Sequence, residues 1–189
     1  MSSKVKVLLL AALAIAPSRA FAQSYIPKPY HPREVAGWNV GPTEDEYGSC
    51  LMYMDYEGVP PTRLALLIDK DGNPSLMISN RDWTVKKNEK YEIDYEFSFG
   101  SYNDHPTLGW EDGSLYTKFS KAFVDQFSRS NYLHIYRDNV VVDKLSLKGS
   151  GAAVAEARRC VAHIQREADA INRERRKFEH IPSNPFARD

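Results

Sequence analysis

Residues 91–99 alternate strictly, with apolar or aromatic side chains at the odd positions and polar side chains at the even positions. Successive side chains of a β-strand point to opposite faces, so this alternation predicts a strand with one face in the core and the other in water. Strands of parallel sheets are buried on both faces and are continuously apolar instead. The segment therefore favours an antiparallel sheet and argues against a doubly wound parallel one.

Further strand patterns surround this segment. Four of them precede it, at residues 38–40, 49–57, 63–69 and 75–79. The Lys-Asp-Gly-Asn-Pro sequence at residues 70–74 predicts a hairpin loop between the last two. Residues 132–136 and 140–147 flank an Asp-Asn turn and predict a second hairpin. Between these regions, the Pro and Gly residues of 101–113 predict loops.

Two amphipathic helices are predicted in the second half of the chain. Four large apolar side chains recur at four-residue intervals, which predicts a helix ending near Ser130: Leu115, Phe119, Phe123 and Phe127. A second helix begins after Gly149, with Ser150 as its N-cap, and its apolar stripe is Ala153, Ala157, Cys160, Val161, Ile164, Ala168 and Ile171. The predicted fold is α+β: an antiparallel sheet, as a sandwich or partial barrel, with one mid-chain helix and a long C-terminal helix.

With 189 residues, the chain is long enough for one domain with a substantial core. We place this single domain at residues 37–171. Three prolines among residues 23–36 favour an extended lead-in before it. Residues 172–189 form the charged end of the last helix and a Pro-containing tail.

The first 22 residues have the features of a secretory signal peptide. Lys4 and Lys6 precede an apolar segment at residues 7–16, and Ala20-Phe21-Ala22 matches the small-x-small cleavage pattern. An N-terminal membrane anchor is the alternative, but this apolar segment is short of the roughly 20 residues needed to span hydrocarbon. We expect an exported protein, periplasmic or secreted, that starts at Gln23 and has no transmembrane segment.

The balance of basic and acidic side chains limits the kinds of partner that the mature protein can bind. The chain carries 25 basic and 25 acidic side chains, and the first 22 residues contribute Lys4, Lys6 and Arg19 but no acid. The mature protein is therefore mildly acidic. Nucleic-acid binders need an excess of Lys and Arg to displace counterions from phosphates. A protein or cell-envelope partner is expected, and a nucleic acid is not.

Cys50 and Cys160 are the two cysteines of the chain. Export delivers an even pair to an oxidising compartment, which predicts a Cys50–Cys160 disulfide. Closing so long a loop would stabilise the fold by about 4 to 5 kcal/mol in the chain-entropy model. The alternative is a nucleophilic Cys160 assisted by His163 one helical turn away, which would need a free thiolate.

Glu92, Asp94 and Glu96 share the polar face of the predicted strand, with successive carboxylates about 6.5 to 7 Å apart. This row could bind a cationic partner or a hard metal ion, or it could be the solvated side of the strand. Calcium needs six or more converging oxygens, which a straight row does not supply. The row is therefore a candidate partner-binding surface, and no metal is expected there.

No catalytic, cofactor-binding or metal-binding motif is recognisable. The five histidines lack zinc-site spacing: His31, His105, His134, His163 and His180. His134 shares a strand face with Tyr132 and Tyr136, which favours an aromatic patch over a catalytic base.

Two loop segments resemble ion-binding motifs only in part. Residues 69–73 begin like a calcium loop, but the Gly comes too early and residue 80 is Asn, so a turn is favoured. Residues 148–151 could hold an anion at a helix N-terminus, but a helix cap is favoured because no phosphate-binding or nucleophile-elbow motif is present.

A set of Trp, Cys and small-residue landmarks runs through residues 37–162. It consists of Gly37-Trp38-Asn39-Val40, Ser49-Cys50, Trp83-Thr84-Val85 with Tyr91, and Leu145-Ser146-Leu147-Lys148-Gly149-Ser150 with Ala152, Ala153 and Cys160. This pattern resembles uncharacterised small exported bacterial proteins and, more distantly, the invasion-associated locus B family. The resemblance implies a periplasmic or secreted protein linked to the envelope or to host contact, with no catalytic residues to carry over. The chain departs from the locus B pattern in its single Cys pair and its long charged C-terminal helix.

These observations favour an exported, non-enzymatic binding or envelope-associated protein. One alternative is a periplasmic hydrolase with an unrecognised acid/base site, because 25 acidic residues always offer carboxylate pairs. Another is an inhibitor or immunity protein that blocks a cationic enzyme, which fits the acidic balance equally well.

Overall fold

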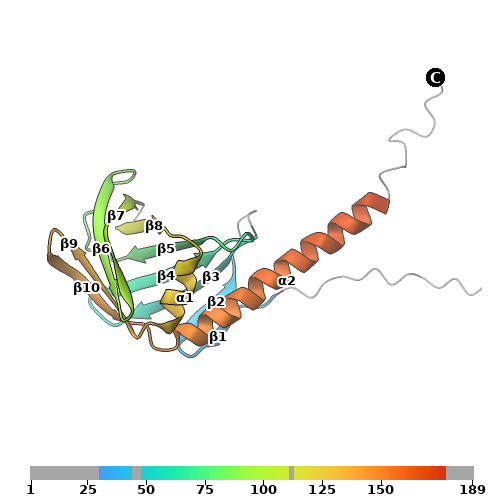
Figure 1. Cartoon of the computed structure of the whole chain (residues 1–189), viewed down its shortest axis with the longest axis horizontal. Coiled ribbons are helices and arrows are strands. Elements are labelled where there is room, and N and C mark those ends of the chain that lie inside the picture. Colours follow the sequence, from blue (N-terminus) through green and yellow to red (C-terminus); the bar gives the residue numbers. More distant parts are fainter. Residues whose placement is uncertain (1–29, 44–47, 111–112, 178–189) are drawn as a thin grey trace, which may run out of the picture.

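The structure is a computed structural model that describes residues 30–43, 48–110 and 113–177. The predicted signal peptide lies outside these residues, as do residues 23–29 of the lead-in and residues 178–189 of the tail. The described chain has the predicted α+β fold, with one ten-stranded antiparallel sheet and two helices (Figure 1).

The elements follow one another in the chain as β1 (Arg33–Val35), β2 (Trp38–Pro42), β3 (Cys50–Tyr56), β4 (Thr62–Ile68), β5 (Pro74–Ser79), β6 (Lys90–Phe97), β7 (Gly100–Gly109), β8 (Ser114–Lys118), α1 (Ala122–Arg129), β9 (Tyr132–Arg137), β10 (Val140–Ser146) and α2 (Ser150–Lys177). The sheet begins at β1, which lies in the segment that the sequence assigns to the lead-in. Both predicted hairpins are confirmed, as β4–β5 and β9–β10.

The strands are ordered β1-β2-β3-β4-β5-β8-β7-β6-β9-β10. Side-chain hydrogen bonds join strands that lie far apart in this order: the Tyr56 hydroxyl donates to the Ser146 carbonyl at 2.5 Å, and the Thr62 hydroxyl to the Asp143 carboxylate at 2.7 Å. The sheet therefore curls until β10 approaches β3 and β4 (Figure 1). Of the two predicted forms, this single curled sheet corresponds to the partial barrel.

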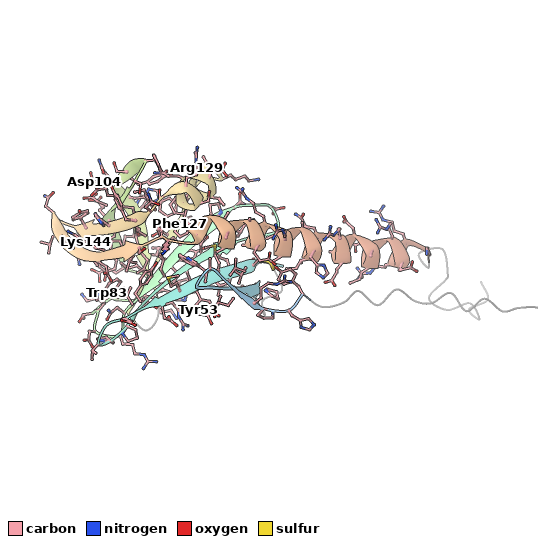
Figure 2. All side chains as sticks on the ribbon, turned by 90° about the horizontal axis from the view of Figure 1, so that it is seen from below. Tyr53, Trp83, Asp104, Phe127, Arg129 and Lys144 are labelled. Carbon is pink, nitrogen blue, oxygen red and sulfur yellow. A yellow bond between two sulfur atoms is a disulfide. The ribbon has the colours of Figure 1, made fainter. Side chains whose placement is uncertain are left out.

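The core fills the inside of the curl. Tyr91, Ile93, Tyr95 and Phe97 of β6 are buried at alternate positions, as the sequence predicts. Phe127 of α1 packs into the same core (Figure 2). Its ring meets that of Trp38 edge-on, with the two centroids 5.8 Å apart. The large aromatic side chains thus join the helix to both halves of the sheet.

The predicted disulfide is present. Cys50 at the start of β3 is bonded to Cys160 of α2 across a sequence separation of 110 residues, and both side chains are fully buried. The first half of α2 packs on β1, β2 and β3, whereas the second half projects beyond the sheet (Figure 1). Ile171 in the projecting half is 55% exposed. No helix in the described part of the chain is long and apolar enough to cross a membrane.

The prediction of loops over residues 101–113 is wrong, because Gly100–Gly109 forms strand β7. Its polar composition is compatible with a strand because β8 pairs only with Leu108 and Gly109 of β7. Among the described residues, the first part of β7 therefore has no strand on that side. Pro106 is tolerated there since it has no ladder partner on that side. Phe99, expected on the core face of the preceding strand, lies in the β6–β7 turn and is 69% exposed.

The predicted mid-chain helix is also too long. Residues 114–118 form strand β8, and the helix begins only at Ala122. Leu115 and Thr117 are buried in this strand, which pairs with β5. The four-residue spacing of Leu115, Phe119 and Phe123 arises because all three side chains reach the core from different elements.

Ser150 does not cap α2 as predicted. Its hydroxyl donates to the carbonyl of Phe127 at 3.1 Å, which ties the start of α2 to α1. Gly149 precedes it with a φ of +85°, and a Cβ at this position would collide with the carbonyl oxygen of Ala36. The Ser150 hydroxyl is therefore engaged with α1, and the predicted cap at the start of α2 is wrong.

Candidate functional site

The outer face of β6 carries the three predicted acidic residues. Glu92 is exposed, whereas Asp94 and Glu96 are half-buried between neighbouring strands. Their orientation follows from the alternation of β6, because the intervening residues fill the core. The three carboxylates thus lie on one side of the sheet, but their surroundings differ.

Strand β9 places an aromatic row beside these acids. Tyr136 lies opposite Asp94, and His134 lies opposite Glu96. The rings of Tyr132 and His134 stack with centroids 4.4 Å apart, and Tyr136 meets His134 edge-on at 6.4 Å. The predicted aromatic patch of His134 with Tyr132 and Tyr136 is therefore confirmed, and it adjoins the acidic row.

Glu96 is the residue at which the two rows meet. The Tyr136 hydroxyl donates to Glu96 Oε2 at 3.1 Å, and His134 Nδ1 lies 3.7 Å from the same oxygen. The hydrogen bond to Glu96 raises the pKa of Tyr136.

Asp94 has a second, structural role. Its Oδ1 accepts the backbone N–H of Asp104 at 2.7 Å, at the irregular register between β6 and β7. Asp104 has a φ of +48°, and this hydrogen bond helps to hold the strained backbone. Asp94 therefore shapes the adjoining surface as well as adding charge to it.

Asp94 and Glu96 together line a polar pocket of about 340 Å³ on this face. Its lining residues come from β6, β7, β9 and the β9–β10 turn: Asp94, Tyr95, Glu96, Ser101, Asn103, Tyr136 and Asn139. Glu92 lies opposite Pro106 and does not contribute to the pocket. We call Glu92, Asp94, Glu96, Tyr132, His134 and Tyr136 the acidic–aromatic face.

The sequence could not reveal this arrangement in full. The alternation in residues 91–99 places the acids on one face, and that in residues 132–136 places the rings on another. Pairing of β6 with β9 joins distant segments, and neither segment encodes the register that sets Glu96 opposite His134. Ser101 and Asn103 were missed because their segment is predicted as a loop.

The acidic–aromatic face lacks the order of groups that nucleophilic catalysis requires. Glu96 lies opposite Ser101 on one side and opposite His134 on the other. Since neighbouring strands are about 4.8 Å apart, the strand that carries His134 is about 9 to 10 Å from the strand that carries Ser101. A serine nucleophile needs the imidazole between itself and the carboxylate, within hydrogen-bond reach of both. Here the carboxylate occupies the middle position.

A nucleophilic role of Cys160 is also excluded, because its sulfur is bonded to Cys50. His163 instead has its Nε2 3.0 Å from the Glu167 carboxylate and packs against the ring of Tyr30. Within residues 30–43, 48–110 and 113–177, no group of three or more His, Cys, Asp and Glu side chains is placed to hold a metal ion.

The segment that begins like a calcium loop is a hairpin turn, as the sequence favours. Asp69 Oδ1 accepts the backbone N–H groups of Asp71 and Asn73, and its Oδ2 accepts the Asn73 side-chain amide. Burial acts against ionisation, but these hydrogen bonds hold the pKa of Asp69 below its usual value. The carboxylate is thus engaged in closing the turn between β4 and β5.

Comparison with known proteins supports the fold and no further property. No family model and no curated protein matches this chain. Among solved structures, invasion associated protein B from Bartonella henselae is similar, with a TM-score of 0.50 and 11% sequence identity over 67% of this chain and 95% of that one. At this identity the likeness concerns the fold alone.

Proposed function

We propose that this chain is an exported, non-enzymatic binding protein that recognises a cationic protein or envelope component through the acidic–aromatic face. The observation that carries the proposal is the arrangement around Glu96. Its carboxylate contacts the Tyr136 phenol and lies close to the His134 imidazole, beside the polar pocket. The sequence features of residues 1–22 support export, and the buried disulfide is compatible with an oxidising compartment.

The chemistry of the face suits Lys and Arg side chains. Carboxylates accept charge-assisted hydrogen bonds from ammonium and guanidinium groups, and tyrosine rings attract the same cations through their π faces. The half-buried positions of Asp94 and Glu96 reduce the screening of their charge by solvent. A basic loop or helix of a protein, including a cationic enzyme that this chain would inhibit, has the complementary chemistry.

The charge of the face is tested by the triple variant E92Q/D94N/E96Q. The Asn and Gln side chains retain oxygen acceptors, so the Asp94–Asp104 hydrogen bond is kept while three charges are lost. A matched control, E34Q/E57Q/D71N, removes three charges from exposed positions elsewhere. Binding of a nona-arginine peptide is measured by calorimetry at two salt concentrations.

We expect the face variant to bind nona-arginine on the order of tenfold more weakly, and the control variant to bind like the wild type. The face variant should also show a smaller salt dependence. Equal weakening in both variants would mean that only the overall charge matters, which contradicts the proposal. Unchanged binding in the face variant would also contradict it.

A further inference from the structure

A second pocket, of about 290 Å³, lies inside the curled sheet at the end away from α2. Figure 2 shows Trp83, one of its lining residues, at this end. The pocket is lined by Asp82, Trp83, Thr84, Val85, Tyr91, Ile93, Leu115, Arg137 and Val142. We call it the end pocket. It shares no residue with the polar pocket of the acidic–aromatic face.

The floor and roof of the end pocket are apolar. Tyr91, Ile93 and Leu115 are core residues, so the pocket reaches the interior of the sheet. Trp83 and Val85 of the β5–β6 connection are partly buried against this core and cover it. An apolar interior of this kind favours a hydrocarbon or aromatic group over a polar one.

The connection that covers the pocket is held at several points. The backbone N–H of Trp83 donates to the Asn80 carbonyl at 3.0 Å, and the backbone N–H of Lys86 donates to the Tyr91 hydroxyl at 2.9 Å. Tyr91 is itself a wall of the pocket, so the roof and the floor are bonded to each other. The end pocket is therefore largely preformed and needs little ordering to receive a ligand.

Arg137 places a positive charge next to the apolar interior of the end pocket. The Arg137 guanidinium lies over the Tyr91 ring, 5.0 Å from its centroid, and the Arg137 side chain is 53% exposed. The Asp138 carboxylate lies 3.5 Å from Arg137 Nε, and the Asp138 side chain is strongly exposed. The ion pair between Arg137 and Asp138 is therefore weak. A ligand anion can therefore replace Asp138 as the partner of the guanidinium. Asp82 adds a negative charge to the lining, but it is exposed and belongs to the connection.

We propose that the end pocket binds a small amphipathic carboxylate, with its apolar part against Trp83, Ile93 and Leu115 and its carboxylate on Arg137. The volume limits the size of this ligand. A pocket of about 290 Å³ lies at the lower end of the range for small-molecule sites, which favours a small ligand. Octanoate has this size and this chemistry. The inference is independent of the proposed function, because the two sites use different residues.

The test compares three ligands of one chain length, octanoate, octanol and octylamine, titrated below the concentrations at which they form micelles. Binding to the full chain is followed by calorimetry and by the fluorescence of Trp83, with W83F as the spectroscopic reference. We expect octanoate to bind on the order of tenfold more tightly than octanol and octylamine. Binding of octanol as tight as that of octanoate would overturn the role of the charge.

Four variants assign the ligand contacts. R137Q should lose the preference for octanoate over octanol, whereas R129Q, which alters an exposed arginine on α1, should retain it. D82N should bind octanoate as tightly as the wild type or more tightly, because a like charge is removed. W83A should weaken both octanoate and octanol, yet leave nona-arginine binding unchanged.

Two results would overturn the proposal even if every variant folds, as checked by circular dichroism. One is an unchanged octanoate preference in R137Q. The other is preferential binding of octylamine that D82N abolishes, since the pocket would then select a cation. Either result would leave the proposed function of the acidic–aromatic face unaffected, because that function is tested with nona-arginine and with variants of other residues.

Discussion

Glu156 is a buried carboxylate on α2 whose side chain is only 6% exposed. It accepts a hydrogen bond from the Tyr30 hydroxyl and lies 3.2 Å from Arg33 Nε and 2.8 Å from Arg159 Nη1. The hydrogen bond from Tyr30 and the nearby guanidinium groups hold the pKa of Glu156 below its usual value. Burial and the hydrogen bond to Glu156 in turn raise the pKa of Tyr30 to about 12. Through Glu156, the start of the described chain at Tyr30 and Arg33 is bonded to α2.

We predict that E156Q destabilises the protein by about 1 to 3 kcal/mol at neutral pH, because it removes the charge from three partners. A carboxyl group with a lowered pKa stabilises the fold above its unfolded-state pKa, near 4.5, and this contribution is lost as the pH falls through the lower folded-state pKa. The wild type and E156Q should therefore converge in stability toward acid pH.

Urea unfolding at pH 7 and at pH 3 to 4 measures this convergence. E34Q, which removes an exposed acid from β1, is the control and should match the wild type at both pH values. A constant difference between E156Q and the wild type across this range would show that Glu156 acts through packing and not through its charge.

The elements of the fold were predictable where one segment carries its own pattern. The alternation of β6, the Asp-Gly-Asn turn after β4 and the helical pattern of α2 are local signals, and all three elements are present. The predicted apolar stripe of α2 is buried only as far as Val161, and its last members, Ala168 and Ile171, are exposed. β7 and β8 were missed because their strand character depends on partners: β6 pairs with β7, and β5 pairs with β8. The register that joins Glu96 to His134 is likewise a property of the pair.

The junction before α2 gives a prediction for a single glycine. Gly149 has a φ of +85° and closely approaches the Ala36 carbonyl, whereas Gly72 has a φ of +81° in the β4–β5 turn, where an added Cβ would meet no atom within 4 Å. G149A should therefore destabilise the protein by at least about 1 kcal/mol more than G72A, since only G149A adds a steric collision to backbone strain. Thermal unfolding of both variants tests this, and equal losses would contradict the close packing of the α2 junction on the β1–β2 turn.

As a whole, the molecule has three surfaces with different chemistry. The acidic–aromatic face lies on β6 and β9, and the end pocket lies at the end of the sheet where Figure 2 shows Trp83. The second half of α2 projects from the other end (Figure 1). The projecting half of α2 ends in the basic residues Arg175, Arg176 and Lys177. A cationic partner is thus attracted to the acidic–aromatic face and repelled by the end of the helix.

Hydrogen exchange of the full chain, with and without nona-arginine, distinguishes these surfaces in a single measurement. We predict that the peptide slows exchange in β6, β9 and the β9–β10 turn and leaves α2 unchanged. The effect should be absent in E92Q/D94N/E96Q and present in E34Q/E57Q/D71N. Protection confined to α2 or to the connection over the end pocket, or protection that persists in the face variant, would contradict the assignment of partner binding to the acidic–aromatic face.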